Sequence, residues 1–434
     1  MRVRLTHLLS VLTGLLLTAT TTAQISLRDV PELARQRAER LRPLQIAALE
    51  PFWEDFALEY STNTAVLDDA ILKASKLGDS VVPLLLEKLQ PAQGGSTSRN
   101  MASNCRRVLS HLDPGSFVDA LAKMARGSHD IARTEAIILL GHADVPQSST
   151  VLTDLIDSAN ATNRSQIIRS LRRLRSPTAA PKIVGLLGSN NRRTREEVLA
   201  YLIAAKASSV VDTVVQALST ESDDRLLPSF IDYFAACTTQ NVAATEALLP
   251  LLSRERIDWQ DTRTLVEALA TVAPKGHKVT IRKLHELIDG NDTSSLAVQA
   301  ALTLRSLGDR KGITRLKRTL DDKVRRRNKE ATLYEQRSTL LFAIDEFSDA
   351  LNDFEKMVLH SEGATMTRRA YVGVLKCESR RNKVTSMVKH MKASGMLQED
   401  FDALAEQDEH FRNAMNHDRV KTFLKQLAKD RAPK

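Results

Sequence analysis

The sequence predicts an all-α fold: an α-solenoid of antiparallel helix pairs. Helix-period apolar stripes recur in pairs along most of the 434 residues. Helix-breaking residues separate the two members of each pair, and successive pairs start 29 to 41 residues apart, between positions 63 and 336. No run combines strand-like alternation with β-branched enrichment. These three observations together favour a repeat array over a single compact core.

The clearest helix pair spans residues 295–322. Its first helix is apolar around much of its circumference, which predicts a nearly buried helix. Gly308 supplies a C-terminal stop, and Asp309 can cap the helix that follows. The second helix has one narrow apolar face, at i, i+3 and i+7, formed by Ile313, Leu316 and Leu320. We therefore expect the rest of its surface to meet water.

The first 23 residues have the pattern of a signal peptide. Arg2 and Arg4 form a basic start, residues 8–17 are an apolar stretch, and small residues precede Gln24. This pattern predicts an exported protein, periplasmic or extracellular, whose mature chain begins near Gln24. An uncleaved anchor is the alternative. No later run is apolar enough to span a membrane, so no transmembrane span is expected in the mature chain.

The remaining chain divides into a repeat region between two caps. Residues 24–61 predict an N-terminal helical cap, because the aromatic run 52–56 can seal the end of a solenoid. Residues 361–434 predict a C-terminal helical cap with less regular stripes. Residues 62–360 hold the repeats. The expected pairs are 64–77 with 81–89, 101–111 with 115–126, 131–141 with 149–160, 165–174 with 178–187, 194–205 with 210–219, 225–236 with 243–252, 262–272 with 279–288, 295–307 with 310–322 and 334–347 with 350–359.

Two pairs carry a recognisable motif. One has Leu77-Gly78-Asp79 before Val82-Pro83, Leu85 and Leu89, and the other has Ala300, Leu304 and Leu307-Gly308-Asp309 before Ile313, Leu316 and Leu320-Asp321. In these residues the chain resembles HEAT repeats, of the short variety also found in phycobilin-lyase-type proteins. The resemblance implies a right-handed superhelix with first helices convex and second helices concave. It implies binding, scaffolding or cargo handling more often than catalysis, and it transfers no catalytic residue.

Positive charge is concentrated in two segments. The formal net charge is +9, of which residues 310–434 contribute +8, from 27 basic and 19 acidic side chains. Residues 24–309 are nearly balanced, with 33 basic and 34 acidic side chains. Within these regions, segments 160–206 and 310–329 each hold ten Lys or Arg against two acids. Both segments are candidates for binding an anion or a charged partner.

The candidate anion- or partner-binding residues are basic side chains of these two segments. They are Arg169, Arg172, Arg173, Arg192, Arg193, Lys311, Arg315, Arg318, Arg325, Arg326 and Arg327. Those at 311–318 share one face of an expected second helix, which would point into the concave side, whereas 192–193 and 325–327 are expected in loops. Such clusters can hold phosphate, sulfate or carboxylate groups. A solvated face that aids solubility is the alternative.

No motif predicts a catalytic, cofactor-binding or metal-binding residue. The sequence has no phosphate-binding Gly-rich loop, no H-E-x-x-H and no C-x-x-C. Cys105, Cys237 and Cys377 lie several repeats apart, too far for a disulfide in a stacked array, and are expected to be small buried hydrophobes.

These observations predict an exported HEAT-repeat binding or scaffold protein that is not an enzyme. It would engage a protein or an anionic polymer through its concave face and basic segments. Export, together with an aromatic content of 4%, disfavours nucleic acid, and recognition by shape and charge disfavours a small-molecule substrate. Two alternatives stay open: an enzyme or cofactor-handling protein of the lyase-like HEAT type, and a structural cell-envelope component.

Overall fold

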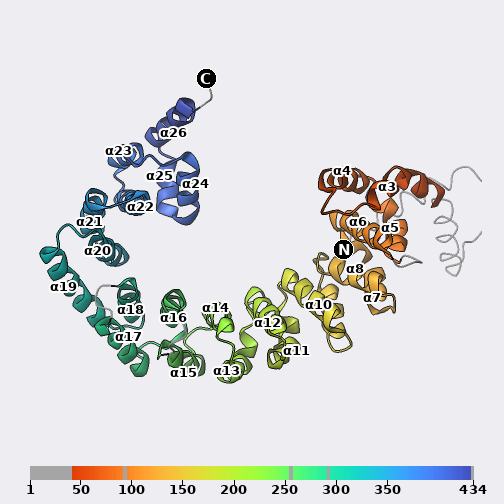
Figure 1. Cartoon of the computed structure of the whole chain (residues 1–434), viewed down its shortest axis with the longest axis horizontal. Helices are drawn as coiled ribbons and strands as arrows, with labels where there is room; N and C mark the ends of the chain where they lie inside the picture. Colours follow the sequence, from red (N-terminus) through yellow and green to blue (C-terminus); the bar gives the residue numbers. More distant parts are fainter. Residues whose placement is uncertain (1–41, 91–94, 254–257, 291–293, 432–434) are drawn as a thin grey trace, which may run out of the picture. The chain divides into compact units, whose positions relative to one another are not determined.

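The computed structural model describes residues 42–90, 95–253, 258–290 and 294–431. These parts consist of α-helices, short 3₁₀ turns and connecting loops, without a β-strand (Figure 1). The all-α prediction is confirmed. The predicted signal peptide, residues 1–23, lies outside the described residues, as does the start of the predicted N-terminal cap.

The chain divides into two compact units, with the division inside α10. Unit 1 ends at Ser170 and unit 2 begins at Leu171. The helices up to the division are α3 (Trp53–Phe56), α4 (Thr64–Ser75), α5 (Val82–Lys88), α6 (Ser96–His111), α7 (Val118–Arg126), α8 (Asp130–Leu140), α9 (Pro146–Leu155) and α10 (Ala161–Leu174).

Unit 2 holds the longer series of helices. They are α11 (Ala180–Ile183), α12 (Arg192–Ala204), α13 (Val211–Thr220), α14 (Leu227–Cys237), α15 (Val242–Leu248), α16 (Trp259–Val272), α17 (Lys278–Gly290), α18 (Ser295–Ser306), α19 (Lys311–Arg326), α20 (Ala331–Ala343), α21 (Phe347–His360), α22 (Ala364–Arg380), α23 (Val384–Ser394), α24 (Gln398–Gln407), α25 (Glu409–Met415) and α26 (Asp418–Arg431). From α12 to α23 they alternate between first and second helices of consecutive pairs.

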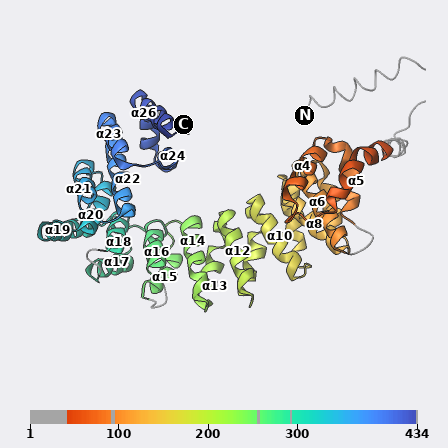
Figure 2. The ribbon, with the colours of Figure 1, turned by 45° about the horizontal axis from the view of Figure 1, so that its top comes forward.

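The helix pairs of unit 2 form two layers. First helices α12, α14, α16, α18 and α20 each pack on the next, and Figure 2 shows α12, α14 and α16 in one row above α13 and α15. In Figure 1 the layer of α14, α16 and α18 lies on the inner side of the curve that unit 2 follows. The expectation that second helices line the concave side is therefore wrong for these pairs.

At α18, small side chains favour the close packing of the inner layer. First helix α18 places small side chains at its contacts, with Ala297, Ala300 and Ala301 all buried. Small residues let helix axes approach closely. Accordingly α16 and α18 are in more extensive contact than the second helices α17 and α19 beside them. The layer with the tighter packing becomes the inner one.

The pair α18–α19 has the geometry that its sequence predicts. Leu296, Leu304 and the alanines of α18 are buried, and α19 buries its narrow face of Ile313, Leu316, Leu320 and Val324. Gly308 has φ of +92°, in the left-handed region that favours glycine, and ends α18. The Asp309 carboxylate then accepts a hydrogen bond from the Lys311 N–H at 2.7 Å.

Side-chain donors tie first helices to the preceding repeat. Each of these contacts reaches a backbone carbonyl 25 to 37 residues earlier: Ser170 to Ile137 at 2.9 Å, Tyr201 to Ser176 at 2.6 Å, Tyr233 to Ala207 at 2.8 Å and Thr303 to Val266 at 2.8 Å. A buried polar group without a partner costs free energy. These hydrogen bonds therefore fix the register between neighbouring repeats.

Aromatic side chains close the described start of unit 1. Phe56 is fully buried, its ring stacked with Phe52 at 6.1 Å between centroids and edge-on to Trp53 at 5.9 Å. The Asn104 side-chain amide of α6 donates to the carbonyl oxygens of Phe56 and Leu58, both at 3.0 Å. These two hydrogen bonds fasten α3 to the first repeat.

The three cysteines are free thiols in the helix core. Cys105 and Cys377 are fully buried and Cys237 nearly so, which confirms that they are small buried hydrophobes. Burial raises the pKa of all three thiols, to about 11 for Cys237 and about 12 for Cys377. With such pKa values, about one thiol in a thousand or fewer is a thiolate at pH 8.

We predict that Gly141→Ala destabilises unit 1. A Cβ at position 141 would lie 2.6 Å from the Cβ and 2.8 Å from the Cα of Ser170, so backbone must shift. The expected loss is about 1–3 kcal/mol, measured as a lower urea midpoint. Gly185→Ala is the matched control, because a Cβ there meets open space. Equal midpoints for the two variants would contradict the close approach of α8 and α10.

We also predict that iodoacetamide at pH 8 leaves all three cysteines of the folded protein unmodified. The reason is that the reactive species is the exposed thiolate, and these thiols are buried and protonated. Intact mass should show no adduct without denaturant and three adducts in urea. Rapid labelling of any one cysteine in the native protein would contradict the burial described for it.

Candidate binding surfaces

The eleven predicted residues lie on three helices and at one helix end. Arg169, Arg172 and Arg173 are on α10, and Arg192 and Arg193 begin α12. The others are on α19 or directly after it. All eleven side chains are exposed, and none lines one of the hollows described below.

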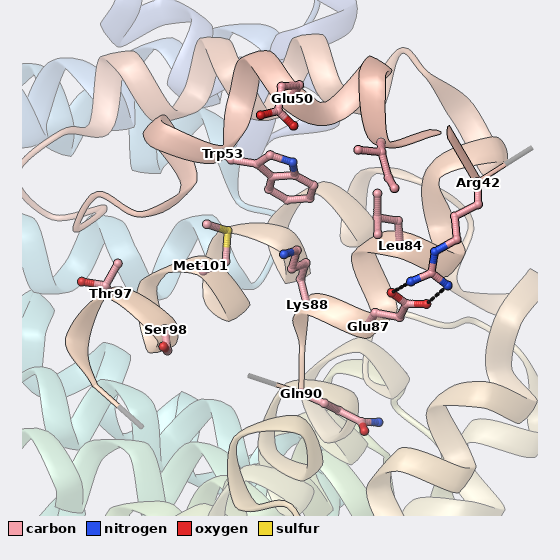
Figure 3. Close-up of a pocket in the computed structure, with 11 residues that line it drawn as sticks. Arg42, Glu50, Trp53, Leu84, Glu87, Lys88, Gln90, Thr97, Ser98 and Met101 are labelled. Carbon is pink, nitrogen blue, oxygen red and sulfur yellow. Dashed lines mark hydrogen bonds and ion pairs between the residues drawn. The ribbon is translucent and has the colours of Figure 1, made fainter. Parts of the chain in front are cut away.

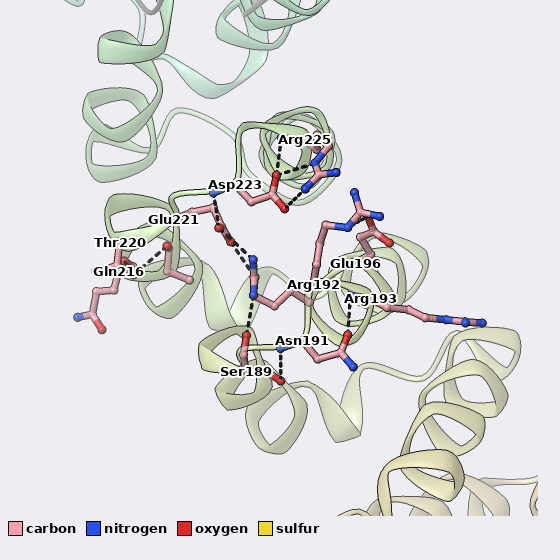
Figure 4. A network of polar contacts seen from close by, with 12 residues as sticks. Ser189, Asn191, Arg192, Arg193, Glu196, Gln216, Thr220, Glu221, Asp223 and Arg225 are labelled. Carbon is pink, nitrogen blue, oxygen red and sulfur yellow. Dashed lines mark hydrogen bonds and ion pairs between the residues drawn. The ribbon is translucent and has the colours of Figure 1, made fainter. Parts of the chain in front are cut away.

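Arg192 and Arg193 are helical, which corrects their expected place in a loop. Asn191 precedes them as the N-cap residue, its side-chain oxygen accepting from the Arg193 N–H at 2.9 Å (Figure 4). Each arginine then pairs along the helix, Arg192 with Glu196 at 3.4 Å and Arg193 with Glu197 at 3.5 Å. Their charges are therefore partly neutralised within α12.

Arg195, one turn into α12, has a structural role. Its guanidinium donates to both carboxylate oxygens of Glu221, at 2.9 and 3.2 Å, and to the Ser189 carbonyl at 2.7 Å. Its side chain is 13% exposed and that of Glu221 is 6% exposed. Glu221 also accepts from the Asp223 N–H at 2.8 Å (Figure 4). This network joins the loop before α12 to the loop after α13.

A stripe of cations runs along the exposed face of α19. Lys311, Arg315 and Arg318 share this face, as predicted from their spacing, opposite the buried apolar residues. Arg325 and Arg326 extend it, because α19 continues to Arg326 and does not end before them, which corrects their expected place in a loop. Basic side chains in a last turn suit the partial negative charge of a helix C-terminus. We call these five residues the α19 stripe.

Part of the α19 stripe is already paired. Arg315 contacts Asp289 at 2.7 Å, and Arg325 contacts Asp322 at 3.7 Å. Arg327, just after the helix, contacts Glu330 at 3.4 Å. Within the described chain, no ion pair involves Lys311, Arg318 or Arg326. Because α19 belongs to the outer layer of unit 2, the stripe does not face the concave side, contrary to expectation.

A hollow of about 640 Å³ lies in unit 1 between the residue 42–53 segment and helices α5 and α6 (Figure 3). Of its four charged residues, Arg42, Glu50, Glu87 and Lys88, all but Glu50 have a described contact with a neighbour. Arg42 donates two hydrogen bonds to the Glu87 carboxylate, both at 3.0 Å. The Lys88 ammonium lies 5.0 Å from the ring centroid of Trp53.

A second hollow, of about 420 Å³, lies between α20 and α22 over α21. We call it the α20–α22 groove. Apolar side chains form its interior: Phe342, Phe354, Met357 and Val372. Charged side chains stand at its rim: Glu335, Arg368, Arg369 and Lys376.

A third hollow, of about 700 Å³, has basic and hydroxyl side chains and no carboxylate in its lining. It lies between the starts of α23 and α26 and is lined by Asn382, Lys383, Val384, Thr385, Ser386, Lys389, His417 and Arg419. The Arg419 guanidinium donates to the Thr385 hydroxyl. Sequence reasoning missed both this hollow and the α20–α22 groove, because each combines side chains of more than one helix.

Neither a metal-ligand cluster nor a membrane-spanning helix occurs among the described residues. No group of three or more His, Cys, Asp or Glu side chains there is placed to hold a metal ion. No helix in the same ranges is long and apolar enough to cross a membrane.

Several known structures are similar to this chain, at low sequence identity. The complex of CpcE and CpcF of phycocyanin lyase from Nostoc sp. is 17% identical, with a TM-score of 0.29, over 55% of this chain and 93% of that one. An engineered protein is 16% identical, with a TM-score of 0.38, over 79% of this chain and 98% of that one. A chain of a full-length AP-3 complex homology model is 10% identical, with a TM-score of 0.44, over 91% and 82%.

No curated protein sequence is significantly similar to this chain. The family comparison is positive: the HEAT-repeat family matches residues 118–203 and 149–235. These matches cover repeats whose sequence motif is weaker than in the two pairs that first suggested the resemblance. Residues 118–235 thus match HEAT repeats, within an all-α fold of repeated helix pairs.

Proposed function

We propose that this HEAT-repeat protein is an exported, non-catalytic binding or scaffold protein that engages an anionic partner along the α19 stripe. HEAT repeats commonly mediate protein interactions, so the partner is an acidic protein or an anionic polymer. The observation that carries the proposal is the stripe: five exposed cations on one face of a single helix.

The geometry of the stripe suits an extended anion. Lys311 and Arg326 are 15 residues apart, which is about 22 Å along a helix. The opposite face of α19 is held by Ile313, Leu316 and Leu320 in the core, so the cations project from a fixed support. Arginine side chains can contact sulfate, phosphate or carboxylate through two N–H groups at once. One acid, Asp322, stands among them and already contacts Arg325.

Binding is proposed over catalysis because of how charged groups are used in the two hollows that contain acidic side chains. In the unit 1 hollow, Arg42 and Glu87 pair with each other. In the α20–α22 groove, the acid Glu335 pairs with Arg369 at 2.9 Å. Groups engaged in this way are poorly placed to transfer protons to a substrate.

We predict that the triple variant Lys311→Gln, Arg318→Gln, Arg326→Gln elutes from a heparin column at lower salt than the unmodified protein. Each lost contact to an anionic group should also reduce the slope of log affinity against log salt by about one. A control variant, Lys76→Gln, Lys123→Gln, Lys425→Gln, removes the same charge from three exposed positions, one directly after α4 and the others on α7 and α26. Identical elution of the two triple variants would show that net charge, and not the stripe, determines retention.

Export is proposed from the signal-peptide pattern of residues 1–23. We predict that the protein isolated from the secreted or envelope fraction of the producing cells begins at or near Gln24. N-terminal peptide mass spectrometry would measure this directly. Recovery of the chain from the cytoplasm with Arg2 and Arg4 still attached would refute the proposal.

A further inference from the structure

The α20–α22 groove exists because two first helices stand apart at this point of unit 2. Both α20 and α22 pack extensively on α21, yet they scarcely touch each other, whereas α16 and α18 pack directly together. The side chains of α21 that lie between them, Phe354 and Met357, therefore form the floor of the groove. Phe342 of α20 and Val372 of α22 are half-buried on its two walls.

Gly373 shapes the same wall. A Cβ at this position would lie 2.4 Å from two ring carbons of Phe354, well inside van der Waals contact. The absence of a side chain lets the backbone of α22 lie directly against the aromatic ring. The result is an apolar hollow of about 420 Å³, within the range of about 300–1,000 Å³ in which pockets bury ligand groups.

The rim of the groove is predominantly positive. Three cations, Arg368, Arg369 and Lys376, line it with one acid, Glu335. Arg369 of α22 contacts Glu335 of α20 at 2.9 Å, and Arg368 pairs with Asp400 outside the groove. Within the described residues Lys376 forms no ion pair. The rim can therefore bind at least one carboxylate of a ligand. That carboxylate could contact Lys376, or it could replace Glu335 as the partner of Arg369.

From this combination we propose that the α20–α22 groove docks a segment of a partner protein, one that carries bulky apolar side chains beside acidic residues. The apolar side chains would fill the space over Phe354, and the carboxylates would meet the basic rim. The exposed Thr339 and Thr365 hydroxyls at the walls can hydrogen-bond to a peptide backbone. A saturated acyl chain has no group to use these partners, and this favours a peptide. The site is separate from the α19 stripe.

The test selects ligands from a phage library of random twelve-residue peptides on the full mature chain. An enriched peptide is then synthesised with fluorescein, and its Kd is measured by fluorescence anisotropy. Thr339→Trp fills the groove and should weaken binding at least about tenfold. Thr332→Trp is the matched control, an exposed threonine on the same helix outside the groove, and should leave Kd unchanged. Thr365→Trp is a second groove-filling variant, used if Thr339→Trp lowers the thermal midpoint.

The charge of the rim is tested separately. Lys376→Glu should weaken peptide binding by about two- to tenfold. The substitution removes one partly exposed ion pair and places a negative charge next to the peptide carboxylate. Lys389→Glu, at an exposed lysine of α23, should have no effect. The triple α19 variant should bind the peptide as tightly as the unmodified protein. The peptide experiment therefore tests the groove independently of the anion binding proposed for the α19 stripe.

Several results would overturn the proposal. They are a library from which no peptide is enriched, enriched peptides without acidic residues, and enriched peptides that bind Thr339→Trp as tightly as the unmodified protein. A dansyl-labelled fatty acid is the second probe. If it binds with the same sensitivity to Thr339→Trp while no peptide is enriched, the groove is a lipid site and a peptide partner is refuted.

Discussion

The hydrogen bonds from buried side chains to the preceding repeat are the constraint on which the rest of this structure depends. Ser170, Tyr201, Tyr233 and Thr303 each donate to a carbonyl of the preceding repeat. Burial raises the pKa of the Tyr201 phenol to about 12, so this group remains a donor at neutral pH. Since every such bond reaches only the neighbouring repeat, stability accumulates locally, as expected of a stacked array.

Local stacking also determines where binding surfaces can form. Second helices such as α19 bury one face against the first helix of the same pair and leave the opposite face exposed to solvent. A row of cations on that face keeps its hydration, so its desolvation penalty is small. Grooves form where stacking loosens. Between α20 and α22 the first helices separate, and Phe354 of the underlying helix lines the groove that opens between them. A basic stripe and an apolar groove are thus two outcomes of the same packing.

The helical pattern could be predicted from sequence because residues within each repeat mark where its helices begin and end. Gly308 and Asp309 mark the break between α18 and α19, and Ile313, Leu316 and Leu320 give the buried face of α19. The helical start at Arg192 was detectable too, since Asn191 is an N-cap residue. The predicted helix began at residue 194, two residues too late.

Other features depend on contacts that a single sequence does not contain. The concave layer is the one whose helices pack more closely. Helices α16 and α18 are in more extensive contact than α17 and α19. The pairing of Arg195 with Glu221 joins positions 26 residues apart, and the α20–α22 groove combines three helices. Charge counting along the sequence found the α19 stripe, because all its residues lie on one helix. It missed the groove, because the groove is formed by side chains of three helices.

Hydrogen–deuterium exchange on a Leu304→Ala variant tests nearest-neighbour stacking most directly. Leu304 is fully buried in α18, so its truncation should cost about 2–5 kcal/mol. If each repeat is held by its neighbours, faster exchange will be confined to α16–α20, and amides of α4–α8 and α24–α26 will exchange as in the unmodified protein. Equal acceleration of exchange throughout the chain would contradict this account.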